Sequence, residues 1–402
     1  MTEELTGALI LGILINQLPA VAILLSRLIK GPSRKPPIEP QSATLDMLGS
    51  VSIVVPTLNE AKRIGPCLAG LSRQSYEVRE IIVVDSRSQD GTQELVKAAG
   101  QKDPRFRLIE DEPLPAGWVG RPWALHSGFL YSSEKSEWIL GIDADTQPHP
   151  GLVAGLLARA SREQYDLISL SPQFILKYAG ELWLQPALLL TLVYRFGPSG
   201  TKAECPERVM ANGQCFLCRR SVLVQMGGYT SAGNSFCDDV TLARSVAAAG
   251  FKVGFLDGAK VLKVRMYEGA LETWREWGRS LDLKDASSQA QVWGDLWLLL
   301  AIQGLPLPIV FCFLLFSLPL SSLSVCLLGL NLFLVAIRFA LNFALAPAYD
   351  RTQAKKPWIF WLSPFADPLA VLRIFLSAVS TPKQWRGRTY GLPPTINRTL
   401  RF

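Results

Sequence analysis

Long apolar stretches near both ends of the chain restrict its fold more than any other feature. Residues 5–28, 296–316 and 320–345 are almost free of charge. Each is long enough to cross the hydrocarbon core of a bilayer, which takes about 20 residues as a helix. The mean hydropathy of the 402-residue chain, +0.21, is high for a soluble enzyme. The sequence therefore predicts an integral membrane protein with transmembrane helices at both ends.

The distribution of basic residues predicts how these helices are oriented. The net charge is +7, and basic residues gather beside the apolar stretches, at Arg27, Lys30, Arg34, Lys35, Lys355 and Lys356 and in the acid-free tail 381–402. By the positive-inside rule these segments, and the region between them, lie on the cytoplasmic face. Glu3 and Glu4 precede the first stretch where a signal peptide would be basic, so it is expected to be an uncleaved anchor. No nucleic-acid motif occurs, and no nucleic-acid partner is expected.

Two further apolar stretches are harder to place. Residues 358–379 contain prolines, Asp367 and Arg373, and a crossing there would put the basic tail outside. A re-entrant or interfacial helical hairpin is favoured, with Asp367 facing a protein-lined or wet cavity. Residues 180–196 are short for a span, so an interfacial helix facing lipid is favoured, with a core helix as the alternative.

Between the apolar ends, the sequence predicts an α/β domain. Short buried-strand patterns alternate with helical ones, the strands at 51–55, 81–84, 106–109, 138–142 and 166–172 and the helices at 61–74 and 92–100. Such alternation predicts a doubly wound sheet. Three strands end in polar residues, which makes a nucleotide pocket at that edge plausible. No Gly-x-Gly-x-x-Gly run or Walker loop follows them, which argues against dinucleotide oxidoreductases and P-loop enzymes.

Asp143 and Asp145 directly follow the strand at 138–142. Ligands of open α/β sheets bind beyond the carboxyl ends of the strands. Two carboxylates there make a hard-oxygen site suited to a divalent cation that also holds a diphosphate. The alternative is a helix N-cap with a turn, since Asp is common in both.

The seven cysteines indicate reduced thiols rather than disulfides, because their number is odd and two lie in apolar stretches. Cys215 and Cys218, with Cys205 and Cys237, offer a zinc site as a minor alternative, although their spacing matches no common zinc module.

Three motifs in order carry a family resemblance: Val-Val-Pro-Thr-Leu-Asn-Glu at 54–60, Ile-Val-Val-Asp-Ser-Arg-Ser-Gln-Asp-Gly-Thr at 82–92, and Ile-Asp-Ala-Asp at 142–145. Over roughly 50–280 the chain resembles the family-two glycosyltransferases of the A-type fold. The run 114–124 resembles a membrane-associated subgroup that includes hopanoid-associated and carotenoid glycosyltransferases. The fold class expected is therefore an A-type nucleotide-diphospho-sugar transferase, a doubly wound mixed sheet, with transmembrane α-helices.

The resemblance implies roles for residues at the donor side. Pro56, Thr57, Asn59 and Glu60 would line the nucleotide, and Asp85 would accept a hydrogen bond from a uracil ring. Asp145, and less directly Asp143, would hold Mg²⁺ or Mn²⁺ against the diphosphate. Arg121 stands where many members have Lys, and would contact the nucleotide or phosphates. For Asn59 and Glu60, a helix cap and first-turn acid is the alternative.

The resemblance also implies an acceptor side. Gly213 and Gln214 match the acceptor segment of the family, and Asp238 and Asp239 stand where it usually has Glu-Asp. By that match Asp239 is the base that deprotonates the acceptor hydroxyl, with Asp238 beside it. A neighbouring acid raises the pKa of such a base towards the working range.

The division expected is an anchor at 1–30, a linker at 31–49, a cytosolic A-type domain at 50–280, an interfacial connector at 281–294, membrane or re-entrant helices at 295–380 and a basic tail at 381–402. The function expected is inverting transfer of one sugar from a nucleotide donor, UDP-linked, to the hydroxyl of a membrane lipid. Three alternatives stay open: a processive polysaccharide synthase, a polyprenyl-phosphate sugar synthase and a non-catalytic membrane scaffold.

Overall fold

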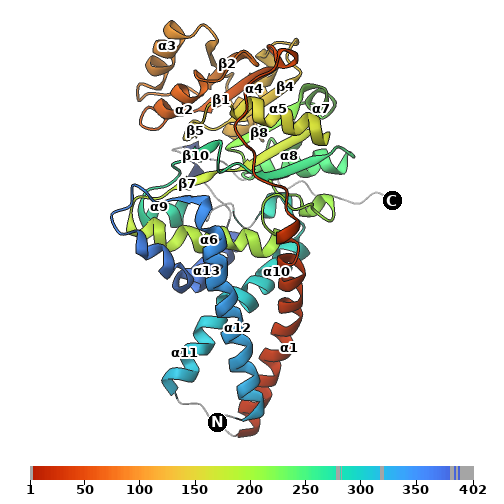
Figure 1. Cartoon of the computed structure of the whole chain (residues 1–402), viewed down its shortest axis with the longest axis vertical. Coiled ribbons are helices and arrows are strands. Elements are labelled where there is room, and N and C mark those ends of the chain that lie inside the picture. Colours follow the sequence, from red (N-terminus) through yellow and green to blue (C-terminus); the bar gives the residue numbers. More distant parts are fainter. Residues whose placement is uncertain are drawn as a thin grey trace.

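The computed structural model describes residues 3–277, 281, 283–316, 321–380, 384–385 and 388–389. An α/β head stands on a stem of long helices, with a layer of shorter helices between them (Figure 1). Nearly all of the basic tail predicted at 381–402 lies outside the described residues.

A seven-stranded mixed sheet forms the centre of the head. Its order is β3-β2-β1-β4-β8-β6-β9, and β8 runs antiparallel to both of its neighbours while the other pairs are parallel. The strands are β1 (Val51–Thr57), β2 (Val78–Asp85), β3 (Phe106–Glu110), β4 (Trp138–Ile142), β6 (Leu167–Ser171), β8 (Cys215–Arg219) and β9 (Val253–Asp257). The predicted doubly wound mixed sheet is confirmed.

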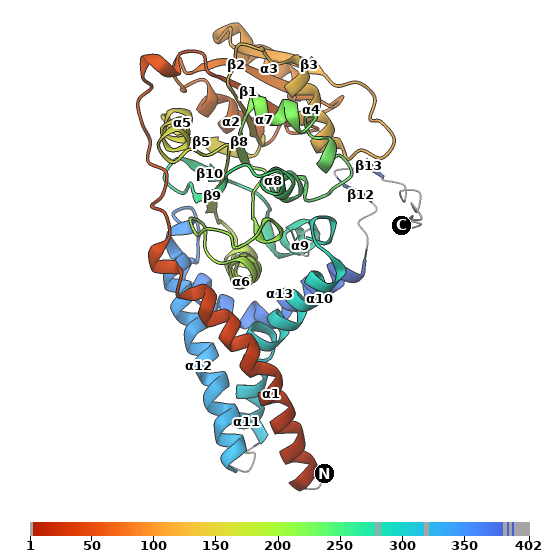
Figure 2. The ribbon, with the colours of Figure 1, turned by 90° about the vertical axis from the view of Figure 1, so that its right-hand side faces the viewer.

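Helices cover both faces of this sheet because its strands are apolar on both sides. Alternate residues of a strand point to opposite faces: Val51, Ile53 and Val55 join one buried cluster, and Val54 joins another. The first cluster contains residues of α2 (Ile64–Leu71), α3 (Thr92–Lys102) and α5 (Leu152–Glu163). The second contains residues of α4 (Gly120–Tyr131), α7 (Arg220–Gln225) and α8 (Asp238–Ala248), and Figure 2 shows this layering.

The same alternation removes the zinc alternative. Cys215 and Cys218 are three residues apart on β8 and lie in the clusters on opposite faces of the sheet. All seven cysteines are free, and the described part of the chain holds no group of three metal-ligating side chains.

A second, four-stranded sheet connects the head to the segment that follows the stem. Its order is β11-β7-β10-β5, built from β5 (Thr146–Pro148), β7 (Gln173–Ile175), β10 (Leu262–Val264) and β11 (Tyr349–Asp350). Because β11 follows the stem helix that ends at Leu345 after only one 3₁₀ turn, Ala346–Ala348, this sheet fixes the stem against the edge of the head where β4 ends.

The stem consists of α1 (Glu3–Leu28), α12 (Ser322–Leu345) and a broken helix, α10 (Gln289–Leu299) and α11 (Pro306–Phe316) joined by a π turn at Leu300–Gly304. Pro306 lacks an N–H, which accounts for the break. Four helical stretches, Leu5–Ser33, Gln289–Phe316, Ser322–Ala348 and Pro357–Val379, are long and apolar enough to cross a membrane. The predicted apolar ends are thus helical.

The layer between head and stem contains α6 (Ala179–Phe196), α9 (Gly269–Glu276), the 3₁₀ helix η9 (Pro357–Ala366) and α13 (Asp367–Val379). From Gly180 onward no residue of α6 is exposed, since it lies against η9, α9, α13 and α10. The favoured prediction of a lipid-facing interfacial helix at 180–196 is therefore wrong, and the core-helix alternative holds. The flanking layers supply apolar contacts on both sides of α6, which its sequence does not reveal.

Asp367 faces a protein-lined site, as expected. Its carboxylate accepts a hydrogen bond from the Arg338 Nε at 2.6 Å and one from Gln303 Nε2 at 3.2 Å. Both side chains of the ion pair are buried, 4% and 3% exposed. The pair thereby ties η9 and α13 to α12.

We expect Asp367→Ala to lower the free energy of unfolding by about 3–5 kcal/mol, because it leaves the Arg338 charge buried without a partner. Thermal unfolding of the full chain in detergent measures the loss. The double variant Arg338→Met/Asp367→Leu removes both charges and should be much less destabilised. Equal destabilisation of the single and double variants would contradict this role.

Candidate active site

The ends of β1 and β4 and the start of α8 surround a cleft of about 800 Å³. It opens between the head and α6. Of the predicted site residues, nine line it: Asn59, Glu60, Arg121, Asp143, Asp145, Gly213, Gln214, Asp238 and Asp239. The aspartates predicted at 143 and 145 and those predicted at 238 and 239, about 95 positions later in the sequence, therefore line the same cleft.

Asp145 lies in this cleft with an unsatisfied carboxylate oxygen. Its Oδ1 is buried and has no hydrogen-bond partner among the described residues. Burial and the neighbouring Asp143 carboxylate raise the pKa of Asp145 to about 7, although Arg63 opposes the shift. A buried acid without a partner is stabilised by a bound cation. The two aspartates therefore fit Mg²⁺ or Mn²⁺ if diphosphate oxygens and water complete the hard-oxygen shell.

Because the Asp145 carboxylate is buried, its ionised form lowers the stability of the metal-free protein. The folded-state pKa of Asp145 lies above the unfolded value of 3.8. Between about pH 4 and 7 the folded state therefore binds more protons than the unfolded state. The free energy of unfolding consequently falls as the pH rises through that window. We expect metal-free Asp145→Asn to unfold several degrees above wild type at pH 8, with the difference disappearing towards pH 4. Calorimetric scans in EDTA measure both. A constant difference at all pH values would contradict the assignment.

Arg121 joins the donor acids to the acceptor acids. It lies at the start of α4 with a side chain 12% exposed. Its Nε donates to Asp143 at 2.9 Å, and its two terminal nitrogens donate to Asp238 and to the Gly213 carbonyl. A Cβ on Gly213 would clash with this guanidinium, so a side chain there would displace the Arg121 head group. The ion pairs of Arg121 were not predicted; the phosphate contact stays a prediction.

Asp238 and Asp239 begin α8, where the helix dipole favours acids, but their partners differ. Asp238 pairs with Arg121. Asp239 is the more exposed of the two, and its Oδ2 accepts the Gly213 N–H at 2.6 Å. Burial raises the pKa of Asp238 to about 7, although the Arg121 charge opposes the shift. Burial also raises the pKa of Asp239, where the Arg121 charge and two backbone N–H groups oppose the shift. Asp239 is therefore the more accessible of the two acids to a molecule in the cleft.

The residues after β1 and β2 build one side of the cleft. Asn59 adopts a left-handed φ of 56°, and its Oδ1 accepts the Gln89 N–H at 2.9 Å. Asp85 is fully buried, and its carboxylate accepts bonds from Thr57, Gln93 and, twice, Ser88. Asp85 thus holds the turn after β2. Its contact with a base stays a prediction, as do those of Pro56, Thr57, Asn59 and Glu60.

Sequence reasoning missed two cations in the cleft, Lys62 and Arg63. Lys62 is exposed, and Arg63 pairs with Glu272 of α9 at 2.9 Å. Both lie within three residues of Glu60, and their position after a strand end was the available signal. Gln214 adds a second buried oxygen, Oε1, without a hydrogen-bond partner in the described chain.

The far wall of the cleft is mostly apolar, apart from Glu272 and Glu276 of α9. It includes Leu192, Met210, Met266, Tyr267, Trp277, Leu281 and Leu283. Trp277 and Leu281 belong to a hydrophobic cluster that also contains residues of α1, α12 and α13. The cleft therefore changes from carboxylates on the sheet side to apolar side chains continuous with the stem.

Comparison with known proteins finds a similar domain in this part of the chain. Residues 52–227 match the model of Glycosyl transferase family 2. The chain is 25% identical over 246 residues to 4,4'-diaponeurosporenoate glycosyltransferase of Staphylococcus haemolyticus. It is also 25% identical over 234 residues to a probable glycosyltransferase, YdaM, of Bacillus subtilis. These matches cover 60% and 58% of this chain but only 64% and 53% of those relatives.

A solved structure shares the architecture over nearly the whole chain. It is the mannosyltransferase PcManGT from Pyrobaculum calidifontis in complex with GDP-Man and Mn²⁺, with a TM-score of 0.56 at 17% identity, covering 93% of this chain and 98% of that one. At this identity the likeness establishes the fold. Residues 52–227 thus match the Glycosyl transferase family 2 model within a domain of the A-type fold, which is joined to apolar helices long enough to span a membrane.

Proposed function

We propose that this protein is an inverting glycosyltransferase that moves one sugar from a UDP-linked donor to the hydroxyl of a membrane lipid. The observation that carries the proposal is the single cleft in which an acid-lined end meets an apolar wall continuous with the stem. A water-soluble donor suits the first part and a lipid suits the second. The relative named for 4,4'-diaponeurosporenoate supports an apolar acceptor. The catalytic domain, 50–280, would face the cytoplasm.

The reaction would be a direct displacement. The acceptor oxygen forms a bond to the anomeric carbon, the bond from that carbon to the diphosphate breaks, and the nucleoside diphosphate leaves with the electron pair. Asp239 would take the hydroxyl proton. Asp238, through its ion pair, would hold Arg121 beside the departing phosphates, while Gly213 and Gln214 would face the acceptor.

Asp145 and Asp143 would hold Mg²⁺ or Mn²⁺, which would stabilise the negative charge that develops on the leaving diphosphate. Support for this comes from the unsatisfied Asp145 oxygen and from the Mn²⁺ in the structurally similar mannosyltransferase. Lys62 and Arg63 would add positive charge at the same end of the cleft.

Turnover of UDP- and GDP-linked sugars by the full chain in detergent, with lipid extract as acceptor and with Mn²⁺ or EDTA, tests the proposal. We expect metal-dependent turnover of one UDP-sugar and a product carrying a single sugar. A ladder of longer products would instead identify a processive synthase. Failure to bind any nucleotide by calorimetry would leave the scaffold alternative.

A further inference from the structure

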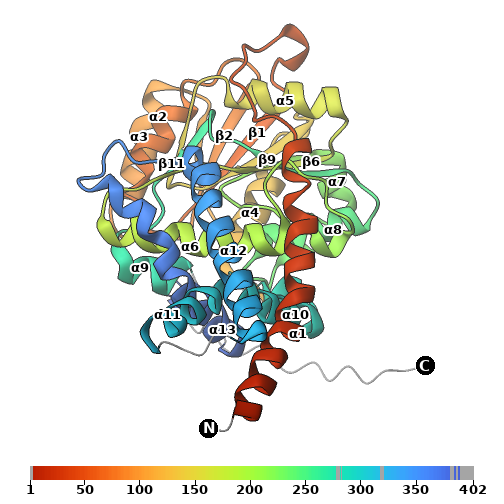
Figure 3. The ribbon, with the colours of Figure 1, turned by 60° about the horizontal axis from the view of Figure 1, so that its bottom comes forward.

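A second cavity of about 660 Å³ lies outside the donor cleft, between the second sheet and η9. We call it the Arg351 pocket; its walls include Gln173, Lys263, Tyr349, Arg351, Trp358 and Trp361. Gln173, Lys263 and Tyr349 come from three adjacent strands, β7, β10 and β11. Figure 3 shows β11 at the end of α12 nearest the head, so the pocket lies where the head meets the stem.

The pocket offers an unneutralised positive charge. Lys263 pairs with Asp350 at 2.6 Å, and Asp350 also accepts two bonds from Thr352, so these charges cancel. Arg351 forms no ion pair with any described residue; its guanidinium lies 4.5 Å from the Phe360 ring centroid and 5.4 Å from that of Trp361. The stacking holds the Arg351 guanidinium in place while leaving its N–H donors available.

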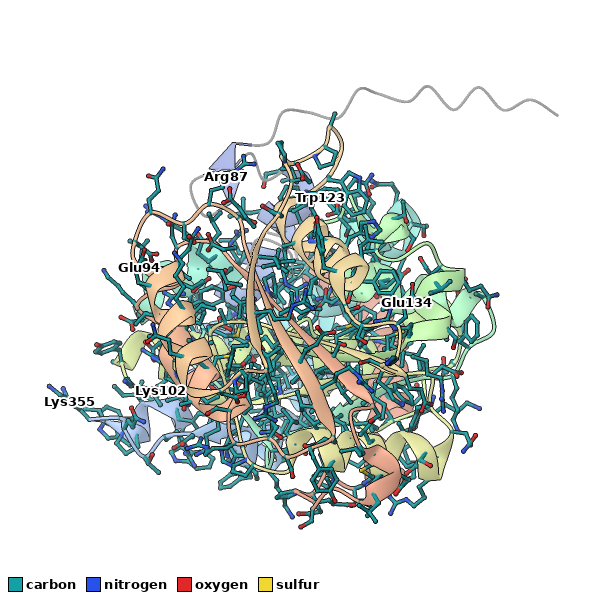
Figure 4. The ribbon with its side chains drawn as sticks, turned by 90° about the horizontal axis from the view of Figure 1, so that it is seen from above. Arg87, Glu94, Lys102, Trp123, Glu134 and Lys355 are labelled. Atoms are coloured by element: carbon teal, nitrogen blue, oxygen red, sulfur yellow. The ribbon has the colours of Figure 1, made fainter. Side chains whose placement is uncertain are left out.

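Two more cations continue this charge outward. Lys355 and Lys356 follow in the same loop and are exposed, and Lys355 projects from the outer edge of the molecule in Figure 4. Trp358, 58% exposed, stands beside them. Basic residues next to an exposed tryptophan are typical of the membrane surface, where anionic headgroups gather.

An apolar stripe along η9 and α13 indicates the depth of that surface. The exposed apolar residues recur every three or four positions: Trp358, Leu362, Phe365, Leu369, Leu372, Leu376 and Val379. The opposite side of the same segment is buried, at Phe360, Ala366, Ala370 and Ile374. Such a pattern belongs to a helix lying in the interface, and α13 runs across the end of the stem in Figure 2.

We propose that the Arg351 pocket binds the phosphate of an anionic phospholipid headgroup. Arg351 would donate two hydrogen bonds to the phosphate oxygens, Lys355 and Lys356 would attract the anionic leaflet, and Trp358 would lie beside the glycerol. The bound lipid would fix the head against the bilayer and hold the interfacial segment in place. The site takes neither donor nor acceptor, so its test is independent of the proposed transfer reaction.

Native mass spectrometry of the full chain, in detergent with equal amounts of phosphatidylglycerol and phosphatidylcholine, tests this site. We expect wild type to retain phosphatidylglycerol preferentially, and Arg351→Gln to bind it roughly fivefold more weakly, since a basic residue near the surface contributes about that factor. The matched control is Arg162→Gln, which removes an equally positive side chain, 65% exposed, from α5 in the head; it should bind as wild type does.

Trp358→Ala provides a second variant, which removes a side chain that is 58% exposed, and it should also weaken retention. Equal retention by wild type and both variants would overturn the proposal. Displacement of the lipid by millimolar inorganic phosphate would overturn it too, because the pocket would then be a site for a free anion.

Discussion

Asp145→Asn is expected to lower the rate of sugar transfer by roughly 10³-fold or more. A metal that acts as a Lewis acid contributes several kcal/mol to stabilising a departing diphosphate, and each 1.4 kcal/mol corresponds to a factor of ten. The buried oxygen that lacks a partner belongs to Asp145, whereas Asp143 is already paired with Arg121. Initial rates at saturating Mn²⁺ measure the effect, and titration of Mn²⁺ should show that saturation is lost as well.

The matched control is Asp46→Asn, which makes the same change at an exposed position outside the cleft. It should transfer sugar at the wild-type rate. The stability experiment separates catalysis from folding, because Asp145→Asn is expected to be the more stable protein without metal and the less active one with it. Wild-type activity in Asp145→Asn would contradict a metal role for this residue.

Asp239→Asn is expected to slow transfer to a hydroxyl acceptor by about 10²–10⁴-fold, the range in which a general base contributes. Nucleotide binding should stay within a few-fold of wild type, because the Arg121 ion pairs to Asp143 and Asp238 are retained. Single-turnover rates and calorimetry with the nucleoside diphosphate, on the same preparation, separate the two effects.

Asp285→Asn is the control for Asp239. The Asp285 carboxylate accepts the Phe236 N–H at 2.8 Å, so it supports the same loop without lining the described cleft. It should reduce transfer only a few-fold. A loss as small in Asp239→Asn would contradict a hydroxyl acceptor. It would mean that the acceptor arrives already ionised, as a polyprenyl phosphate or a carboxylate does.

Much of the fold follows from local sequence. The strands at 51–55, 81–84 and 138–142 were predicted because residues buried on both faces must be apolar throughout. The stem helices were predicted because a bilayer imposes a minimum apolar length. Asp143 and Asp145 were predicted as a pair because they follow a strand end, where open sheets bind ligands. These properties depend on neighbours in the chain.

Other properties depend on contacts between distant segments, and only the tertiary structure decided them. The sequence of α6 fits both a lipid-facing helix, which it favours, and a core helix, and the covering layers of η9, α9 and α13 decide for the core helix. Arg121 meets Asp143 and Asp238 only once β4, α4 and α8 are placed on one sheet. Burial and pairing are set by where the chain returns in space, so the identity of the acids was readable in the sequence, whereas the partner and the protonation of each acid were not.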